Sequence, residues 1–218
     1  MRAAQRASVA GAAGNIEVAA SLPDSAPRAV AVVAHPHPLY GGTMDNKVVT
    51  TVARAFTEAG ASTFRFNFRG VGATQGTHDE GRGETDDALA VIAHAKSAAG
   101  DLPLWLAGFS FGGAVAVKAS ARIEFRQLVL VAPAFRRLTG HGLGEAPDPN
   151  DPELGEIGRH TLANTLVVHG DRDETVLLAD SIAWATLREV PIVVAPGADH
   201  FFHRKLNILR EAVGRWLA

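Results

Sequence analysis

The chain has 218 residues, of which 47% are hydrophobic and 20% charged, with a formal net charge of -2 at pH 7 and no cysteine. This length and composition predict a single globular domain over residues 1–218 and exclude disordered and fibrous classes. No run of Lys or Arg stands out, so neither nucleic acid nor a membrane surface is expected as a partner. The absence of cysteine excludes disulfide bonds, thiolate metal sites and a cysteine nucleophile.

The N-terminal stretch, residues 1–14, is rich in alanine and is interrupted by Gln5, Arg6 and Ser8. A signal peptide needs a more strongly apolar segment of about 7–15 residues, so none is expected here. No window approaches the roughly 18 consecutive apolar residues of a membrane span. We therefore expect a cytoplasmic protein.

Further along the chain, short apolar runs alternate with longer segments of helical periodicity. The apolar runs predict strands over residues 28–34, 62–67, 102–107, 127–132, 165–169 and 190–195. The periodic segments predict helices over residues 46–59, 85–98, 112–121 and 179–187, and a final helix that buries Leu206, Leu209, Val213, Trp216 and Leu217. Gly60 is expected to end the first helix, and Thr85 to cap the second, with Asp86 and Asp87 in its first turn. This alternation predicts an α/β fold in which a mostly parallel central sheet carries helices on both faces.

One segment, residues 136–164, breaks the alternation. It contains Pro147, Pro149, Pro152 and five glycines, and it shows little periodicity. This composition predicts a long surface loop, and long loops in compact domains are often functional.

The strongest chemical signal is the motif Gly-Phe-Ser-Phe-Gly at residues 108–112, where a predicted strand ends and a predicted helix begins. In this context the motif indicates a nucleophile elbow, a sharp turn that holds Ser110 in a strained backbone conformation. Gly108 and Gly112 are needed because side chains at these positions would collide across the turn. The turn also places the Ser110 hydroxyl at the N-terminus of a helix, whose dipole favours developing negative charge.

A serine nucleophile needs a base within hydrogen-bond reach and an acid that orients the base. With this elbow, the acid and then the base follow the serine in the chain, just after the ends of strands. Asp173 and His200 meet these requirements, since each follows a predicted strand. Asp171 is a rival for the acid. Asp199 is poorly placed to orient its neighbour in the chain, and His203 is expected on the surface in the first turn of the final helix.

Acyl transfer also needs two backbone N–H groups that bind the oxyanion. Phe111, the residue after the nucleophile, is expected to supply one of them. The other should come from the loop His-Pro-His-Pro-Leu-Tyr-Gly-Gly at residues 35–42. Its prolines have no N–H, so His37, Leu39 or a later residue is the donor, and we favour His37.

Apolar side chains near these loops are candidates for the wall of the substrate pocket. The candidates are Leu39, Tyr40, Met44, Phe201 and Phe202. Ordinary packing explains the same residues equally well, because large apolar side chains are common in any core.

A metal site at His35 and His37 would need further ligands, and the chain offers neither cysteine nor a His-Glu-x-x-His motif. The remaining histidines are scattered, which is typical of surface or hydrogen-bonded side chains: His78, His94, His141 and His160. We expect neither a metal nor a cofactor. The glycines of residues 66–72 fit a turn near the mouth of the site, since a phosphate-binding loop would need a lysine and another spacing.

Together these segments resemble the small, lidless α/β-hydrolases, a family of predicted serine esterases and hydrolases. The resemblance is carried by HPHPLYGGTMDNKVV, FRFNFRGVGATQG, GETDDAL, LWLAGFSFGG, HGDRDETV and GADHFF, which span residues 35–202. It implies the α/β-hydrolase fold with no cap domain and a triad of Ser110, Asp173 and His200, with Asp173 rather than Asp171 as the acid. It also implies hydrolysis of short acyl esters or thioesters without a cofactor. Many relatives carry a helical cap where this chain has only residues 136–164, so the resemblance implies an open, shallow site.

Two other kinds of function fit the same features. A non-catalytic α/β-hydrolase scaffold that serves as a binding protein should lose members of the triad, whereas all three candidates are present here. An acyltransferase, a peptidase or a perhydrolase would use the same triad with another substrate or acceptor. A dehalogenase is excluded because it would need an acid in place of Ser110.

Overall fold

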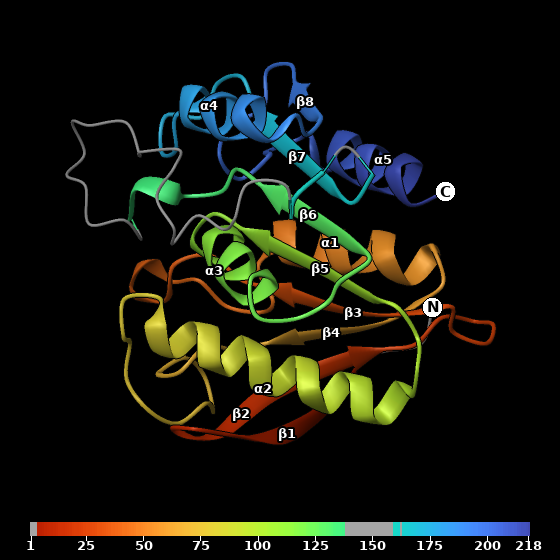
Figure 1. Ribbon diagram of the computed structural model, residues 1–218. Helices are drawn as coiled ribbons and strands as arrows, with labels where there is room; N and C mark the ends of the chain where they lie inside the picture. The colour runs from red at the N-terminus through yellow and green to blue at the C-terminus, as the bar shows by residue number, and fades with distance from the viewer. Residues whose placement is uncertain (1–3, 138–158, 162) are drawn as a thin grey trace.

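The computed structural model describes residues 4–137, 159–161 and 163–218. Within these residues, eight strands form one sheet in the order β1-β2-β4-β3-β5-β6-β7-β8 (Figure 1). The strands are β1 (Gln5–Gly11), β2 (Gly14–Ser21), β3 (Ala29–Ala34), β4 (Ala61–Phe66), β5 (Leu104–Phe109), β6 (Gln127–Val131), β7 (Thr165–Gly170) and β8 (Ile192–Ala195). Strand β2 is antiparallel to β1 and β4, and every other neighbouring pair is parallel. The expected mostly parallel sheet is therefore confirmed.

Helices cover both faces of the sheet, as predicted. The helices are α1 (Lys47–Glu58), α2 (Arg82–Ala99), α3 (Phe111–Ser120), α4 (Leu178–Arg188) and α5 (Leu206–Leu217), with short 3-10 turns at η1 (Pro38–Tyr40) and η2 (Phe135–Arg137). One core lies between the sheet and α1 and α5, and the other between the sheet and α2, α3 and α4. Strand β5 serves both, because Leu106 faces the second core and Trp105 the first.

Helix α1 shows how the local sequence sets an element. Its apolar residues recur at helical spacing and are buried: Val48, Val49, Val52 and Phe56. The Asn46 side chain accepts the Val48 N–H at 2.8 Å and so caps the first turn. Gly60 follows the helix with a φ of 94°, the left-handed conformation that was expected of it.

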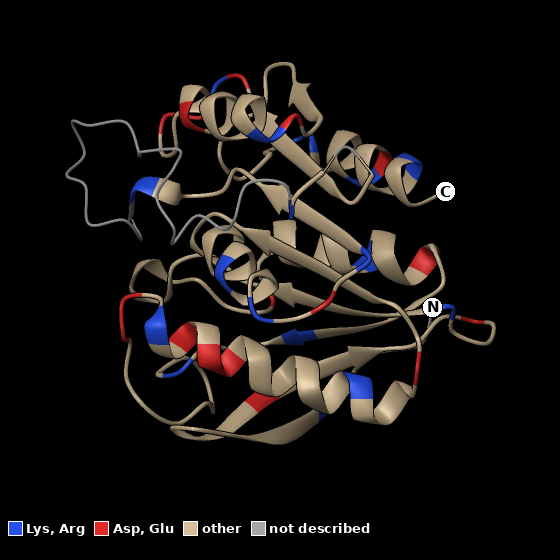
Figure 2. Cartoon of the chain, in the orientation of Figure 1, with Lys and Arg blue, Asp and Glu red and all other residues tan. Residues whose placement is uncertain are grey.

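Helix α2 begins three residues earlier than predicted. Thr85 is not its cap but lies fully buried inside the helix, where its hydroxyl donates to the Gly81 carbonyl. The first turn is capped instead by Asp79, whose carboxylate accepts the Gly83 N–H at 3.0 Å. Figure 2 shows a basic residue at the start of α2, acidic residues in the rest of its first half and another basic residue near its end. Glu84 in the first turn, rather than Asp86 or Asp87, and Lys96 in the last turn suit the helix dipole.

The N-terminal hairpin of β1 and β2 was not predicted from the sequence. Strand β1 is mostly exposed and buries only Val9, so its alanine-rich sequence carries little apolar alternation. Strand β2 buries Ile16 and Val18 on one face. No described helix is long and apolar enough to cross a membrane. Most of the loop expected at residues 136–164, together with His141, lies outside the described residues.

Candidate active site

Ser110 stands at the turn between β5 and α3, at the carboxyl end of the sheet. Its φ of 55° and ψ of -119° are strained for a residue with a side chain. The turn is held because the Ser110 N–H donates to Val131 of the neighbouring strand at 2.9 Å, and its carbonyl accepts the Gly113 N–H at 2.9 Å. These bonds connect the end of one buried strand to the start of a buried helix.

The glycines beside Ser110 are required by close backbone contacts, as predicted. A methyl group on Gly108 would lie 2.0 Å from the Gly112 carbonyl oxygen, across the turn. A methyl group on Gly112 would lie 2.3 Å from the carbonyl oxygen of His35, just after β3. The second contact brings the elbow against the loop that was expected to contribute to the oxyanion hole.

The loops after β7 and β8 bring Asp173 and His200 to Ser110. Nε2 of His200 lies 3.1 Å from Ser110 Oγ, and Nδ1 of His200 lies 2.7 Å from Oδ2 of Asp173. All three residues are buried. Their order and distances match a serine, a base that faces it and an acid that orients the base.

The carboxylate of Asp173 is held by groups on several sides. Oδ1 accepts the N–H of Thr175 at 2.9 Å and that of Val176 at 2.8 Å. Oδ2 faces His200 and, at 3.2 Å, Nε2 of the buried His169. Burial alone would raise the pKa of Asp173, but hydrogen bonds from His169, His200 and Val176 outweigh burial and hold the pKa well below its ordinary value. Asp173 is therefore an anion at neutral pH.

The rivals for these roles have other partners. Asp171 is exposed, and its Oδ1 accepts the Gly197 N–H at 2.6 Å, so it joins the two loops rather than orienting the histidine. Asp199 lies 2.7 Å from Nδ1 of His203. His203 is exposed, as expected, but it precedes α5 and does not lie in its first turn.

A cavity of about 240 Å³ opens beside the nucleophile. It is lined by Pro36, His37, Tyr40, Gly41, Gly42, Asn46, Ser110, Thr175, His200 and Phe201. The predicted pocket residues Tyr40 and Phe201 belong to this lining. Leu39 is 68% exposed and does not belong to this lining, and Met44 and Phe202 are fully buried in the core.

The hydrogen bonds of the loop at residues 35–42 bear on the second oxyanion donor. The Leu39 N–H donates to Nδ1 of its neighbour His37, and the N–H groups of Tyr40, Gly41 and Gly42 donate to loop carbonyls. Every later donor considered from the sequence is therefore used inside the loop. His37 lines the cavity, and its ring lies 4.8 Å from that of Phe111, the first residue of α3. The N–H groups of a first helical turn have no partner within the helix.

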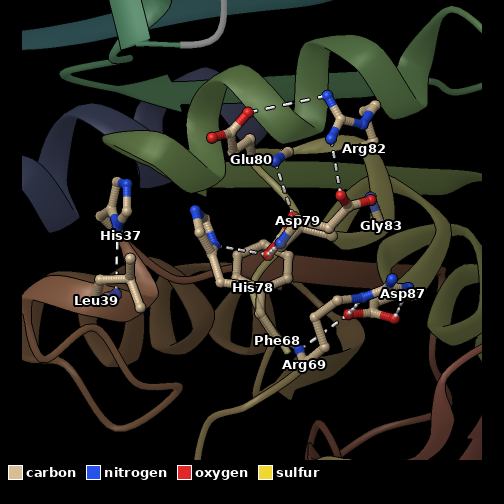
Figure 3. Close-up of polar contacts among 12 residues, drawn as sticks. His37, Leu39, Phe68, Arg69, His78, Asp79, Glu80, Arg82, Gly83 and Asp87 are labelled. Carbon is tan, nitrogen blue, oxygen red and sulfur yellow. Dashed lines mark hydrogen bonds and ion pairs between the residues drawn. The ribbon is translucent and has the colours of Figure 1, made fainter. Parts of the chain in front are cut away.

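The turn at residues 66–72 lies behind this loop rather than at the mouth of the cavity. Phe68 packs its ring 5.7 Å from that of Phe111, and Arg69 makes a two-pronged ion pair with Asp87 of α2 (Figure 3). Figure 3 also shows His78 beside His37, with ring centroids 4.9 Å apart. His78 lies 2.7 Å from the buried carboxylate of Glu84, at the start of α2.

The described histidines outside the triad have partners of other kinds. Nε2 of the buried His35 accepts the Phe68 N–H at 3.0 Å, and Nδ1 lies 2.6 Å from the Pro36 carbonyl. His160 is buried against Phe125 and Trp184. Among the described residues, no three His, Asp or Glu side chains gather closely enough to hold a metal ion.

Comparisons with known proteins agree with this geometry. A lidless α/β serine hydrolase from Xanthomonas campestris is 36% identical, with a TM-score of 0.83 over 100% of this chain and 94% of that one. An α/β serine hydrolase homologue from Coxiella burnetii is also 36% identical, with a TM-score of 0.84 over 100% of this chain and 99% of that one. An uncharacterised protein of Rickettsia prowazekii is 30% identical over 95% of this chain and 86% of its own length.

The family model described as serine aminopeptidase S33 matches residues 25–147, a segment that runs from before β3 past Ser110. The segment includes the loop beside the cavity and the whole elbow. Of the two structural relatives, the Xanthomonas protein is described as a serine hydrolase without a lid and the Coxiella protein as a serine hydrolase homologue. The chain therefore belongs to the serine aminopeptidase S33 family and is a serine hydrolase of the α/β-hydrolase fold, the lidless kind that its motifs resemble.

Proposed function

We propose that this chain cleaves small, uncharged acyl esters or thioesters through Ser110, His200 and Asp173. The observation that carries the proposal is the unbroken chain of contacts from Ser110 Oγ through both ring nitrogens of His200 to the Asp173 carboxylate. The nucleophile and base both line the cavity in which a substrate would lie. A binding protein would have no need to bury and align these three groups.

In the proposed reaction, Ser110 Oγ attacks the acyl carbon while Nε2 of His200 takes the hydroxyl proton. Asp173 holds the hydrogen on Nδ1 and stabilises the imidazolium. The N–H groups of Phe111 and His37 face the oxyanion that forms on the carbonyl oxygen. His200 then gives the proton to the leaving alcohol or thiol. Water, activated by the same histidine, releases the acid and restores Ser110.

The size of the cavity supports a short acyl group. A volume of about 240 Å³ falls below the ~300–1,000 Å³ of typical ligand pockets. An acetyl or butyryl ester fits such a space, whereas a long-chain ester would extend past Tyr40 and Phe201 at the rim.

The charge of the lining supports a neutral substrate. None of the described residues that line the cavity is Asp, Glu, Lys or Arg. An aminopeptidase must bind the free ammonium group of its substrate, and a desolvated ammonium needs a charged partner. The lining therefore favours esters and thioesters over the peptides that the family's description names.

A substrate panel tests the proposal. It contains p-nitrophenyl acetate, butyrate and decanoate, an acetyl thioester and alanine p-nitroanilide, with fluorophosphonate labelling as a direct report on the nucleophile. We expect hydrolysis of the short esters and the thioester, little activity on the decanoate or the anilide, and labelling of wild type. Ser110→Ala should abolish labelling and lower kcat by about 10⁶-fold.

Ser120→Ala is the matched control, because Ser120 is a buried serine on α3 whose hydroxyl donates to the Val117 carbonyl of the same helix. It should retain both activity and labelling. Full activity in Ser110→Ala would contradict the triad. Preference for the anilide would favour an aminopeptidase, and wild type that is neither active nor labelled would favour a binding protein.

A further inference from the structure

His169 is a second buried histidine beside the acid. It lies in β7, one residue before the strand ends at Gly170, and its side chain is fully buried. The lone histidine of an apolar strand is usually part of the core, and its ring nitrogens must then be satisfied inside the protein. Here they are satisfied by the loop that carries Asp173 and by α4.

The partners of His169 define which ring nitrogen carries its hydrogen. Nε2 lies 3.0 Å from the Val176 carbonyl oxygen and 3.2 Å from Oδ2 of Asp173, and both of these atoms are acceptors. Nδ1 lies 2.8 Å from the Ser181 hydroxyl, which can donate to a neutral ring. His169 is therefore the Nε2–H tautomer, with that single N–H directed at two oxygens of the acid loop.

The loop that carries Asp173 is also held by hydrogen bonds to the other oxygen of its carboxylate. The N–H groups of Thr175 and Val176 both donate to Oδ1 of Asp173. Val176 thus donates its N–H to the carboxylate and presents its carbonyl to His169. Thr175, between Asp173 and Val176 in this turn, lines the cavity. The position of His169 consequently affects both the carboxylate that faces His200 and one wall of the site.

We propose that His169 is a positioning residue for Asp173, an inference that rests on the proposed function of the triad. The network runs from Ser110 through His200, Asp173 and His169 to Ser181 of α4. Its first three residues perform the chemistry. His169 is not among the described residues that line the cavity, so it acts by fixing the carboxylate, and a shift of about 1 Å costs roughly 10²-fold in rate.

Two substitutions of similar size separate this role from simple packing. Glutamine places its amide nitrogen near the position of Nε2, so His169→Gln keeps a donor toward Asp173 and Val176. Asparagine places its amide near the position of Nδ1, so His169→Asn keeps only the contact with Ser181. Both remove the ring from the same buried site, and a packing role predicts equal effects.

The experiment measures kcat and KM for p-nitrophenyl acetate, the rate of fluorophosphonate labelling and the melting temperature. It also records the downfield proton NMR signal of the hydrogen between His200 and Asp173. We expect His169→Asn to lower kcat and the labelling rate by about 10–100-fold with KM within about twofold, and to shift or broaden the signal. His169→Gln should keep the signal and lose less than about fivefold in kcat. Ser181→Ala, which removes only the hydroxyl donor to Nδ1, should lower kcat by about three- to tenfold if the His169 variants do not fold.

Equal losses in the two His169 variants, or a KM effect without a kcat effect, would overturn the positioning role. So would an unchanged kcat in His169→Asn, or in Ser181→Ala where the His169 variants do not fold. In these cases an active wild type and an inactive Ser110→Ala would leave the proposed function standing. A wild type that neither hydrolyses the ester nor labels would overturn the proposed function, and the role of His169 with it.

Discussion

The backbone N–H of Phe68 donates a hydrogen bond of 3.0 Å to Nε2 of His35, which joins the residues just after β4 to those just after β3. The opposite ring nitrogen lies 2.6 Å from the Pro36 carbonyl oxygen, so Nδ1 carries the hydrogen and Nε2 has the lone pair. A proton on Nε2 would oppose the Phe68 N–H. His35 thus stabilises the loop beside the cavity only in its neutral form.

This relationship predicts a loss of stability in acid. Burial lowers the pKa of His35 from its ordinary value of 6.5 to about 4, against a raising effect of the Pro36 carbonyl. Between these values the unfolded chain binds a proton that the folded chain does not, so stability is full above pH 6.5 and falls as the pH drops toward 4. At 1.36 kcal/mol per pKa unit, His35 should contribute a loss of about 3 kcal/mol in the free energy of unfolding by pH 4.

His35→Gln isolates this contribution, because its amide oxygen keeps an acceptor for Phe68 but cannot titrate. Urea denaturation at pH 7 and pH 4 should show a smaller acid loss in this variant than in wild type. His94→Gln is the control, since His94 is exposed on α2, and its acid loss should match that of wild type. An acid loss as large in His35→Gln as in wild type would contradict the assignment.

A second prediction concerns two aspartates two residues apart in the acid loop. Asp173→Asn should lower kcat by about 10⁴-fold, because an amide favours the wrong tautomer of His200. Asp171→Asn should stay within about threefold of wild type, since an amide oxygen can still accept the Gly197 N–H. Both changes remove one negative charge from the same loop. Ester kinetics at constant ionic strength measure the difference, and similar losses in both variants would contradict the choice of Asp173 as the acid.

The sequence predicted the parts of the fold whose signals are local and strong. Runs such as residues 127–131 are buried on both sides, so their apolar composition alone indicates a strand. The β1–β2 hairpin escaped prediction because β1 buries only Val9 and pairs through its backbone with β2. The start of α2 was misplaced because its caps act across a turn: Asp79 accepts the Gly83 N–H and Glu84 accepts the Gly81 N–H.

The site residues also divide into those with a local sequence signal and those without one. Ser110 directly follows β5, Asp173 and His200 lie in the loops that follow β7 and β8, and the parallel sheet brings these carboxyl ends together. The pocket wall depends on how each loop turns, which the sequence does not encode locally, so Met44 proved to be core while Asn46 and Thr175 line the cavity. His169 was passed over because a histidine within an apolar strand carries no signal of its partners.

A third prediction tests the elbow. Gly108→Ala should destabilise the protein by at least about 3 kcal/mol and abolish ester hydrolysis, because its methyl group would lie 2.0 Å from a backbone oxygen that cannot move aside. Gly214→Ala in α5 is the control, since a methyl group there meets nothing within 4 Å. It should raise the free energy of unfolding by about 0.5–1 kcal/mol and leave kcat unchanged. Urea denaturation and kcat are measured for both variants. A Gly108→Ala variant that is as stable and active as wild type would contradict the steric requirement.

The last prediction compares neighbouring aspartates on α2 with unlike surroundings. Asp87 is almost fully buried and accepts hydrogen bonds of 2.8–3.0 Å from the backbone N–H, Nε and Nη2 of Arg69 (Figure 3). These bonds hold the turn at residues 66–72. Asp86 pairs at 3.2 Å with Arg122, and both side chains are exposed. Asp87→Asn leaves the charge of Arg69 largely buried without its counter-ion. It should lower the free energy of unfolding by about 3–5 kcal/mol.

Asp86→Asn breaks only a solvent-screened pair and should cost less than about 1 kcal/mol. The two variants carry the same change in net charge, so urea denaturation at pH 7 compares the two environments directly. A higher salt concentration should reduce the small difference in unfolding free energy between Asp86→Asn and wild type. It should leave most of the larger loss in Asp87→Asn, because salt screens buried ion pairs only weakly. Equal losses of unfolding free energy in both variants would mean that the turn at residues 66–72 does not depend on the Arg69–Asp87 pair.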